Sequence, residues 1–402
     1  MEKVMKNKLL MLVVSFLCCT AQDLVWAEPS VDPVSLPQDK SILFWSTAQR
    51  SLAFRIMEKI APHRVVKRSA RVSKLTDGAP LTILSDDGKP FDLDRYMQDQ
   101  QTAGVIALHK GKIRLERYGL GFDSEQRWTS FSVAKSFTST LVGAALQDGA
   151  IESLDTPITR YIPELKDSGY DGVTVEQLLT MRSGVQWNED YSDPNSDVVK
   201  FGQQKPMDGI DPVISYMQTK QRDAEPGSRW QYNTGETNLI GVLVAKATGK
   251  TLADYLSEKI WRPLNMESDA IWVLNAGGFE IAGCCLSARL RDYARLGVFA
   301  LNGGQIDGKQ IVPVGWFERA GSKQADIGRD GYGYGYQWWT YDDGSFAAQG
   351  IFGQGIFIDP NRDLVIATNG NWPVATGDAL KIQRNAMYRA VQRTLDTELL
   401  DQ

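Results

Sequence analysis

The sequence is poor in the residues on which several common kinds of catalytic site depend. Its 402 residues contain only two histidines, His63 and His109, and only four cysteines. His109 lies in the turn-like segment His109-Lys110-Gly111-Lys112, and neither histidine has a sequence neighbourhood that resembles a general base. This scarcity argues against a Ser-His-Asp triad and against a histidine-rich zinc site.

The cysteines are too few for a disulfide framework. Cys18 and Cys19 fall in the N-terminal segment, which leaves the adjacent Cys284 and Cys285 in the rest of the chain. Neighbouring cysteines can form a small disulfide ring, but the interpretation that the sequence favours is two small, buried thiol side chains.

The sequence also lacks a strong excess of charge. Its formal net charge is −5, and no basic block is interleaved with aromatic residues. Nothing therefore indicates binding to nucleic acid or to an anionic membrane. With 43% hydrophobic and 23% charged residues, the chain can bury a large core, in one large domain or two intimately joined domains.

The apolar run near the N-terminus is too short to span a bilayer comfortably as a mature helix. It extends from Leu9 to Cys19, follows three lysines within the first eight residues, and precedes Val25-Trp26-Ala27. This pattern is typical of a secretory signal peptide with its cleavage site. We therefore predict a signal peptide over residues 1–27, export to the periplasm or the exterior, and no stable membrane span after its removal.

The segment Trp128–Gly149, WTSFSVAKSFTSTLVGAALQDG, carries the strongest candidate for chemistry. Its small and apolar residues predict a buried helix from Ser132 to Gln147, closed by Gly149 in a left-handed conformation. Because residues three apart share a helix face, the Lys135 amine can reach the Ser132 hydroxyl. The Ser132 N–H at the helix start can stabilise an oxyanion, and burial can lower the pKa of Lys135. The pattern predicts a serine nucleophile with an amine base, the alternative being a helix start with an exposed lysine.

Periodicity elsewhere predicts a mixed α/β chain. The alternating runs Gly104–Leu108 and Ile113–Tyr118 predict a hairpin, and residues 41–61 predict a packing helix before Pro62, followed by an irregular, exposed segment over Val65–Asp86. Further predicted helices are Val173–Met181, 211–219, Asn238–Ala247, Leu252–Trp261, Leu286–Leu301 and Ala379–Leu395, and further predicted strands are Gly335–Tyr341, Ser345–Gln349, Gly355–Asp359 and Leu364–Thr368. This order predicts an antiparallel sheet flanked by helices, plus a helical lobe, with the Ser132 helix at their junction.

Two further segments are candidates for the walls of a cleft. Residues 182–210 are rich in Gly, Asn, Asp, Ser and Pro and contain Trp187 and Tyr191. Such a segment is typical of a functional rim, and a merely solvated loop is the alternative. Tyr232 lies in a turn before a predicted helix, where a phenol can be held rigidly in a cleft; a buried core tyrosine is the alternative.

Five motifs, in this order, resemble those of the serine β-lactamase and penicillin-recognising superfamily, in its class C branch. That branch also contains family VIII carboxylesterases and 6-aminohexanoate-dimer hydrolases. The motifs are WTSFSVAKSF at Ser132, Leu154–Leu165 followed by VTVEQLLTMRSGV from Val173, WQYNTGETNLIG around Tyr232, LRDYARLGVFALNGG from Leu290, and GIFGQGIFIDP from Gly350. The resemblance as a whole covers nearly the entire mature chain, from about Phe54 to Val391.

The resemblance implies an α/β (α+β) fold of the β-lactamase/transpeptidase type, with the active site between a sheet lobe and a helical lobe. It implies an N-terminal extension with a packing helix over residues 28–80. The β-lactamase-like serine hydrolase domain would then occupy residues 81–402, with the helical lobe inserted at about 131–264.

The resemblance also implies roles for the residues that match the motifs. Ser132 would be the acylated nucleophile, Lys135 its hydrogen-bonded partner, and Tyr232 the phenol that exchanges protons with the reacting groups. The backbone N–H groups of Ser132 and Ile351 would form the oxyanion hole. The implied substrate-binding residues are Trp187, Tyr191, Thr234, Gln349 and Gly350. The mechanism requires no metal and no organic cofactor.

Two departures from the family pattern bear on the substrate. The second motif, usually Tyr-x-Asn, ends here in Thr234, and the third begins with Ala348 in place of the usual Lys or His. Loss of that cation removes an anchor for a β-lactam carboxylate, worth about 1.5 to 3 kcal/mol if charge-assisted. The Tyr232-x-Thr234 pattern, followed by Gly-Glu-Thr, looks closer to the 6-aminohexanoate-dimer hydrolases.

The sequence thus predicts an exported serine hydrolase that cleaves a small-molecule ester or linear amide through an acyl-enzyme. One alternative is a β-lactamase or a D-alanyl carboxypeptidase-like enzyme. Another is a β-lactam sensor that is acylated without turnover, or a fold reused for binding alone. The oligomeric state is left open.

Overall fold

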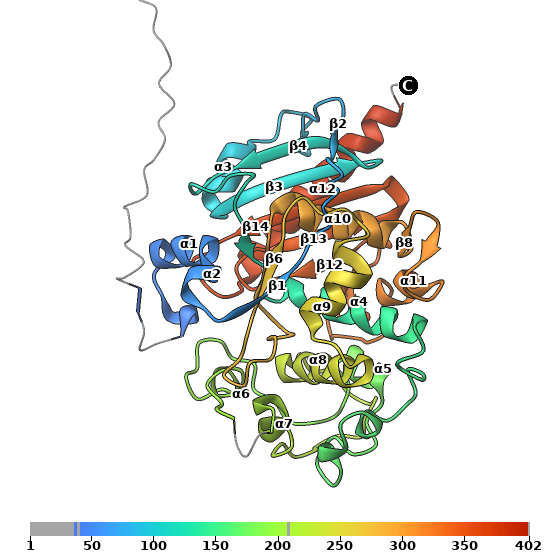
Figure 1. Cartoon of the computed structure of the whole chain (residues 1–402). Helices are drawn as coiled ribbons and strands as arrows, with labels where there is room; N and C mark the ends of the chain where they lie inside the picture. The colour runs from blue at the N-terminus through green and yellow to red at the C-terminus, as the bar shows by residue number, and fades with distance from the viewer. Residues whose placement is uncertain (1–35, 38–40, 207–209, 401–402) are drawn as a thin grey trace, which may run out of the picture.

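An eight-stranded sheet forms the centre of the computed structural model, which describes residues 36–37, 41–206 and 210–400 (Figure 1). The strand order is β10-β11-β12-β13-β14-β3-β4-β2, and only the β2–β4 pair is parallel. Its strands are β2 (Thr76–Asp77), β3 (Thr102–His109), β4 (Lys112–Tyr118), β10 (Tyr332–Tyr334), β11 (Trp339–Tyr341), β12 (Phe346–Gln349), β13 (Gly355–Asp359) and β14 (Leu364–Gly370). The predicted signal peptide, residues 1–27, lies outside the described residues.

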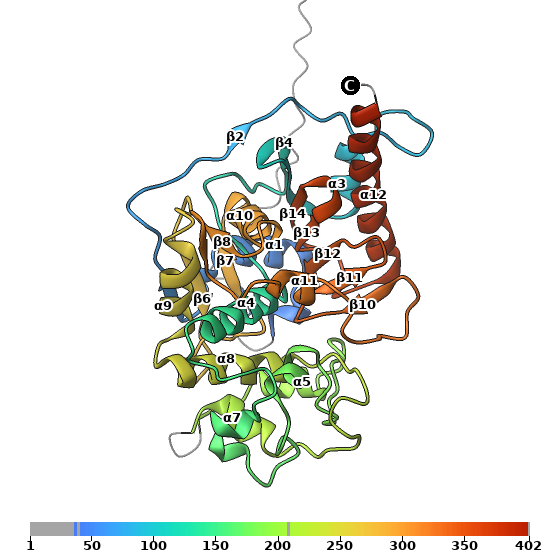
Figure 2. The ribbon, with the colours of Figure 1, turned by 90° about the vertical axis from the view of Figure 1, so that its right-hand side faces the viewer.

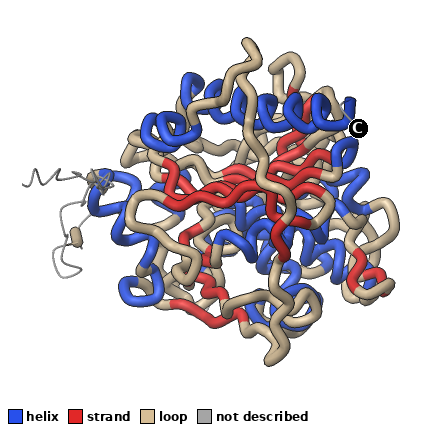
Figure 3. Tube along the Cα trace, turned by 90° about the horizontal axis from the view of Figure 1, so that it is seen from above, coloured by secondary structure: helices blue, strands red, loops and turns tan. Residues whose placement is uncertain are grey.

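Alternation along β3 explains why helices cover both faces of this sheet. Val105 and Ala107 pack with α3 (Leu93–Asp99) and α12 (Asp378–Leu400), whereas Ile106 and Leu108 face the core that contains α10 (Leu290–Leu301). Successive side chains of a strand point to opposite faces, so a fully apolar strand needs cover on both sides. Figure 3 shows the strands as a layer between helices. The predicted antiparallel sheet flanked by helices is confirmed.

A smaller sheet follows the order β1-β6-β7-β5, and it corrects two predictions. Its strands are β1 (His63–Val66), β5 (Trp128–Thr129), β6 (Ala270–Val273) and β7 (Leu286–Ala288), and a separate two-stranded sheet joins β8 (Gln305–Ile306) and β9 (Lys309–Gln310). The segment Val65–Asp86 is thus not wholly irregular and exposed, because Val66 is buried and β1 pairs with β6. The helix predicted from Leu286 begins at Leu290, because the residues before it pair with β6 and β5.

The other predicted elements are largely confirmed. The helix predicted over residues 41–61 is divided into α1 (Thr47–Arg55) and α2 (Met57–Ile60), because Ile56 between them leaves the helical conformation with φ −126° and ψ 28°. The strand predicted over 335–341 forms only β11, after a turn that follows β10. The predicted hairpin is the β3–β4 pair, and the predicted terminal helix is α12.

The helical lobe lies below the sheet in Figures 1 and 2 and consists of one long helix, α8, and several short ones. They are α5 (Val175–Leu179), α6 (Asp197–Phe201), α7 (Pro212–Met217), α8 (Thr234–Thr248) and α9 (Leu252–Leu256), and α9 continues as a π-helical turn over Ser257–Trp261. Thr174 caps α5 with a capping box and Asp211 caps α7. Another short helix, α11 (Trp316–Ala320), lies near the sheet.

The helix α4 (Val133–Gln147) connects the two lobes, because it packs on α8 and on β12. Gly149 follows it with φ 73°, the left-handed conformation that its sequence predicts. The N-terminal helix α1 joins the same core, where the Phe54 ring contacts the rings of Trp128, Phe131 and Phe352. The division into residues 28–80 and 81–402 stays a prediction. None of the helices in the described part of the chain is both long and apolar enough to cross a membrane.

Candidate active site

Ser132 lies at the N-terminus of α4, directly after a constrained turn. Phe131, the residue before it, has φ 43°, a left-handed conformation that is uncommon for a bulky side chain. The turn is fixed at its start, where the Ser130 N–H donates to the Leu286 carbonyl at 2.8 Å. The turn therefore sets the direction of Ser132, which lines a cavity between the lobes.

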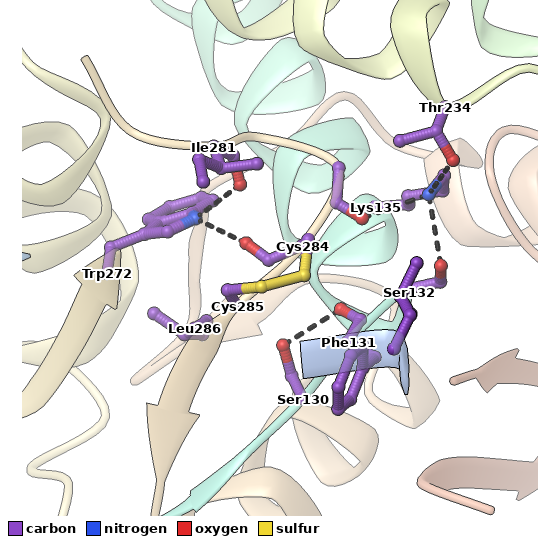
Figure 4. Close-up of a disulfide and its surroundings, with 12 residues drawn as sticks. Ser130, Phe131, Ser132, Lys135, Thr234, Trp272, Ile281, Cys284, Cys285 and Leu286 are labelled. Atoms are coloured by element: carbon purple, nitrogen blue, oxygen red, sulfur yellow. Dashed lines mark hydrogen bonds between the residues drawn. A yellow bond between two sulfur atoms is a disulfide. The ribbon is translucent and has the colours of Figure 1, made fainter. Parts of the chain in front are cut away.

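The Lys135 ammonium is buried and donates to three acceptors. Its Nζ lies 3.1 Å from Ser132 Oγ, 3.0 Å from Thr234 Oγ1 and 2.9 Å from the Gly283 carbonyl oxygen (Figure 4). These contacts use all three protons of an ammonium. Burial lowers the pKa of Lys135 to about 8, against the opposing charge of Glu189. A substantial fraction of the amine is then neutral near pH 8 and can accept the Ser132 proton.

The ring of Tyr232 also lies close to this amine. Lys135 Nζ is 5.2 Å from the centroid of its ring, and the ring stacks on Trp339 with centroids 5.5 Å apart. Burial, aided by the charge of Glu189, raises the pKa of the Tyr232 phenol above its ordinary value, and a hydrogen bond with Ser132 opposes this shift. The phenol therefore remains protonated near neutral pH and is suited to giving a proton to a leaving group.

Sequence reasoning missed Glu189, which connects several predicted site residues. Its carboxylate accepts hydrogen bonds from the Trp187 indole, from the Tyr191 hydroxyl at 2.6 Å, and from both the amide, at 3.0 Å, and the hydroxyl of Thr234. Thr234 in turn accepts from Lys135. The position between Trp187 and Tyr191 is the only sequence feature that could have singled out Glu189, because acidic residues are common throughout that loop.

The predicted oxyanion hole depends on a close backbone approach at Gly350. A Cβ atom there would lie 2.8 Å from the Ser130 carbonyl oxygen and 2.6 Å from Gln354 Oε1, so a side chain does not fit. This approach places the Ile351 amide near the start of α4. Among the described residues, no group accepts a hydrogen bond from the amide of Ser132 or of Ile351. Both amides are thus available to a developing oxyanion.

Two cavities meet at this centre. The larger, of about 370 Å³, is mainly apolar and is lined by Ser132, Thr234 and both cysteines, among other residues. The smaller, of about 150 Å³, is lined by Tyr232, Gln349 and Gly350 and by several cationic side chains. Tyr191 and Ile351 line both cavities and mark the boundary between them.

Trp187 is the one predicted substrate-binding residue that lines neither cavity. Its side chain is buried against Phe201 and Tyr216, and its indole N–H donates to Glu189. Trp187 therefore lies behind the cleft and orients the carboxylate that bonds Tyr191 and Thr234.

Cys284 and Cys285 are joined by a disulfide, so the interpretation of two buried thiols is wrong. Cys285 has φ 70°, and the Trp272 indole N–H donates to the Ile281 and Cys284 carbonyl oxygens at 2.9 and 3.1 Å (Figure 4). The turn held in this way directs the Gly283 carbonyl at Lys135. No cluster of three or more metal-ligating side chains of His, Cys, Asp or Glu occurs within the part of the chain that the structure describes.

Comparison with known proteins decides the family. The sequence profile of the beta-lactamase family matches residues 92–387. The chain belongs to the beta-lactamase family. A 6-aminohexanoate-dimer hydrolase from Paenarthrobacter ureafaciens is 33% identical over 299 residues, which cover 70% of this chain and 76% of that protein. The protein is thus a serine hydrolase of this superfamily, in agreement with the resemblance seen in its motifs.

Solved structures of this family share the fold. A Bacillus anthracis protein proposed to be a 6-aminohexanoate-dimer hydrolase aligns with a TM-score of 0.74 and 24% identity, over 86% of this chain and 94% of that one. A family VIII carboxylesterase aligns with a TM-score of 0.56 and 19% identity, over 74% and 95% of the two chains. The predicted β-lactamase/transpeptidase-like fold is therefore confirmed.

Proposed function

We propose that this protein is an exported serine hydrolase that cleaves an ester or a linear amide through an acyl-enzyme on Ser132. The observation that carries the proposal is the buried Lys135 amine, 3.1 Å from the Ser132 hydroxyl and in contact with the Tyr232 ring. A nucleophile, a base of lowered pKa and a protonated phenol are the groups that acyl transfer requires.

In the acylation step, neutral Lys135 takes the Ser132 proton while Oγ attacks the substrate carbonyl. The negative charge of the tetrahedral intermediate falls on the former carbonyl oxygen, which the amides of Ser132 and Ile351 stabilise. The bond to the leaving oxygen or nitrogen then breaks as Tyr232 gives that atom its proton, and the Lys135 ammonium can restore the proton of the phenol. The products are the acyl-enzyme and the free alcohol or amine.

In the deacylation step, a water molecule attacks the acyl carbon. Its proton passes to the Tyr232–Lys135 pair, the ester bond to Ser132 Oγ breaks, and the serine recovers its proton. The carboxylic acid leaves and the starting protonation state returns. Each step needs only groups of this chain, the substrate and water.

The third motif favours esters and linear amides over β-lactams. Ala348 lies buried on β12 where the family pattern usually has a cation, so this strand offers no charge to a β-lactam carboxylate. The relative from Paenarthrobacter ureafaciens is named for hydrolysis of a 6-aminohexanoate dimer, which supports a linear amide as substrate. A β-lactamase, a D-alanyl carboxypeptidase-like enzyme and a non-turnover sensor are the alternatives.

Export is proposed from the N-terminal sequence and is consistent with the Cys284–Cys285 disulfide. Disulfides persist in the periplasm and outside the cell but are rare in the reducing cytosol.

Comparison of mature protein with its Ser132→Ala variant tests this function on three substrates. They are a short-chain 4-nitrophenyl ester, a 6-aminohexanoate dimer and a chromogenic cephalosporin, each followed through the initial burst and the steady rate. We expect steady, Ser132-dependent turnover of the ester or the amide, with little turnover of the cephalosporin. Rapid cephalosporin turnover would instead establish a β-lactamase, and a stoichiometric burst without a steady rate would establish a sensor.

A further inference from the structure

Three cationic side chains line the smaller cavity beside Tyr232. Lys381 and Arg384 lie three residues apart on α12, and Arg329 precedes β10. Of the three, within the described residues, Lys381 alone has a carboxylate within salt-bridge distance, the exposed Asp378 at 3.7 Å. Such an exposed pair is weak because water screens it. The cavity therefore carries positive charge that the described part of the chain does not neutralise.

Arg384 is the most informative of these residues, because its side chain is only 3% exposed. Its guanidinium donates to Gln349 Oε1 at 2.9 Å and to Asn385 Oδ1 at 3.3 Å, and both acceptors are neutral amides. A buried charge without a charged partner is costly, and buried arginines are normally paired with an anion. Arg384 thus forms a buried, positively charged site that has no anionic partner among the described residues.

The neighbouring cations reinforce this charge. Burial lowers the pKa of Lys381; Asp378 opposes that shift, and the charges of Arg384 and Arg329 lower the pKa further. The Arg329 guanidinium lies 4.6 Å from the centroid of the Tyr332 ring, and the Tyr332 hydroxyl accepts from Asn385 at 3.2 Å. The three cations therefore act on one small volume.

The catalytic groups indicate which half of a substrate would enter this cavity. Tyr232, the proposed proton donor to the leaving group, lines the cationic cavity. Ser132, which keeps the acyl group, lines the larger apolar cavity, and none of the described residues that line that cavity is charged. The leaving group thus faces the cations, and the acyl chain faces apolar side chains and the disulfide.

We propose that Arg384, with Lys381 and Arg329, forms a subsite for a carboxylate on the leaving group. The substrate is then an uncharged, apolar acyl group joined to an amine or alcohol that bears a carboxylate, as in an N-acyl ω-amino acid. This inference rests on the proposed function. This substrate differs from the 6-aminohexanoate dimer for which the relative is named, because the dimer carries an ammonium on its acyl half, and none of the described residues that line the larger cavity carries a charge to pair with it.

Two matched esters test the subsite: the hexanoyl ester of 4-nitrophenol and that of 3-carboxy-4-nitrophenol. We expect wild type to show the higher kcat/KM for the carboxylated ester. Arg384→Gln should lower the ratio of the two kcat/KM values about tenfold to a hundredfold, the range expected for a charge-assisted hydrogen bond. Lys381→Gln should also lower the ratio. Arg384→Lys keeps the positive charge and should therefore retain part of the preference for the carboxylated ester.

Arg393→Gln is the matched control, because Arg393 lies on the same helix but pairs with the exposed Asp86. It should leave both kcat/KM values unchanged. An unaltered ratio in both Arg384→Gln and Lys381→Gln, or an equal loss on both esters, would overturn the subsite. Absence of Ser132-dependent turnover of either ester would instead overturn the proposed function itself.

Two measurements on wild type remain decisive even if Arg384→Gln does not fold. 6-Acetamidohexanoate should inhibit ester hydrolysis at a concentration at least tenfold lower than its neutral methylamide. N-hexanoyl-6-aminohexanoate should be cleaved faster than the 6-aminohexanoate dimer, from which it differs by the lack of the ammonium. Equal inhibition by acid and amide would contradict the carboxylate subsite, and faster cleavage of the dimer would contradict the apolar acyl half.

Discussion

Two buried cations, Lys135 and Arg384, lie in different parts of the cleft. Burial has different consequences for them because their side chains differ in type. Lys135 is 1% exposed and Arg384 is 3% exposed, and neither contacts a carboxylate among the described residues. Burial lowers the pKa of Lys135 to about 8, so this amine can lose its proton. A guanidinium stays protonated in proteins, so Arg384 keeps its charge. Burial thus suits the lysine to act as a base and suits the arginine to bind an anion.

A permanent charge in place of the Lys135 amine tests whether this residue must lose its proton. Lys135→Arg keeps a cation beside Ser132 but removes the ability to titrate. We expect kcat to fall about 10³-fold, within the range typical for loss of a general base, and Lys135→Ala to fall by a similar factor. Steady-state ester hydrolysis, with circular dichroism to verify folding, measures the effect. Retention of more than a tenth of wild-type kcat in the arginine variant would show that Lys135 is not the base.

Glu236 is a buried acid on α8, and burial shifts its pKa in the direction opposite to that of Lys135. Burial raises its pKa to about 8, against a hydrogen bond from Ser183. The folded state therefore holds a proton that the unfolded state releases above about pH 4.3, so the contribution of this group to stability falls as the pH rises towards 8.

Glu236→Gln removes this titration. From pH 5 to pH 8, the free energy of unfolding of the variant should rise relative to that of wild type by up to about 3 kcal/mol, because only wild type loses stability through this titration. Urea unfolding at the two pH values measures the difference, with the exposed Glu152→Gln as a control. A pH-independent difference between Glu236→Gln and wild type would mean that Glu236 is ionised in the folded protein.

Replacement of Glu189, whose charge acts on Lys135, should change the activity less than replacement of Lys135 itself. The Glu189 carboxylate raises the pKa of Lys135, in opposition to burial. Glu189→Gln should therefore lower that pKa and move the rising limb of the pH profile of kcat/KM, expected near pH 8 in wild type, to lower pH. Plateau activity should fall several-fold, because the hydrogen bonds from Trp187, Tyr191 and Thr234 lose a charged acceptor.

Asp190→Asn is the control for this shift, because Asp190 is adjacent but exposed. It should leave the rising limb in place. A Glu189→Gln profile that does not move, or that moves to higher pH, would show that Glu189 does not act on the charge of Lys135.

The parts of the fold that follow from local pattern were predictable. The helix after Ser132, the β3–β4 hairpin and the terminal helix all depend on spacing within a few residues. Strands β1, β6 and β7 were not predicted, because each is only three or four residues long and is fixed by pairing with distant segments. The same reason explains why Leu286–Ala288 was assigned to the helix that follows it.

The candidate site divides in the same way. Its motifs pointed to Ser132, Lys135 and Tyr232, but Glu189 and Arg384 carry no local pattern that separates them from other charged residues. The position of Trp187 behind the cleft and the Cys284–Cys285 disulfide depend on how the loop and the turn pack.

The spacing of Ser132 and Lys135 already places them on one face of a buried helix, because helical periodicity is a local property. The chemistry open to this pair depends on contacts with distant parts of the chain. The other acceptors of Lys135, Thr234 and Gly283, lie 99 and 148 residues away in the sequence. The burial that lowers the lysine pKa comes from the packing of both lobes around α4. The buried Arg384 lies at the smaller cavity because α12 and β12 bring it together with Gln349, and no spacing within the chain encodes that contact.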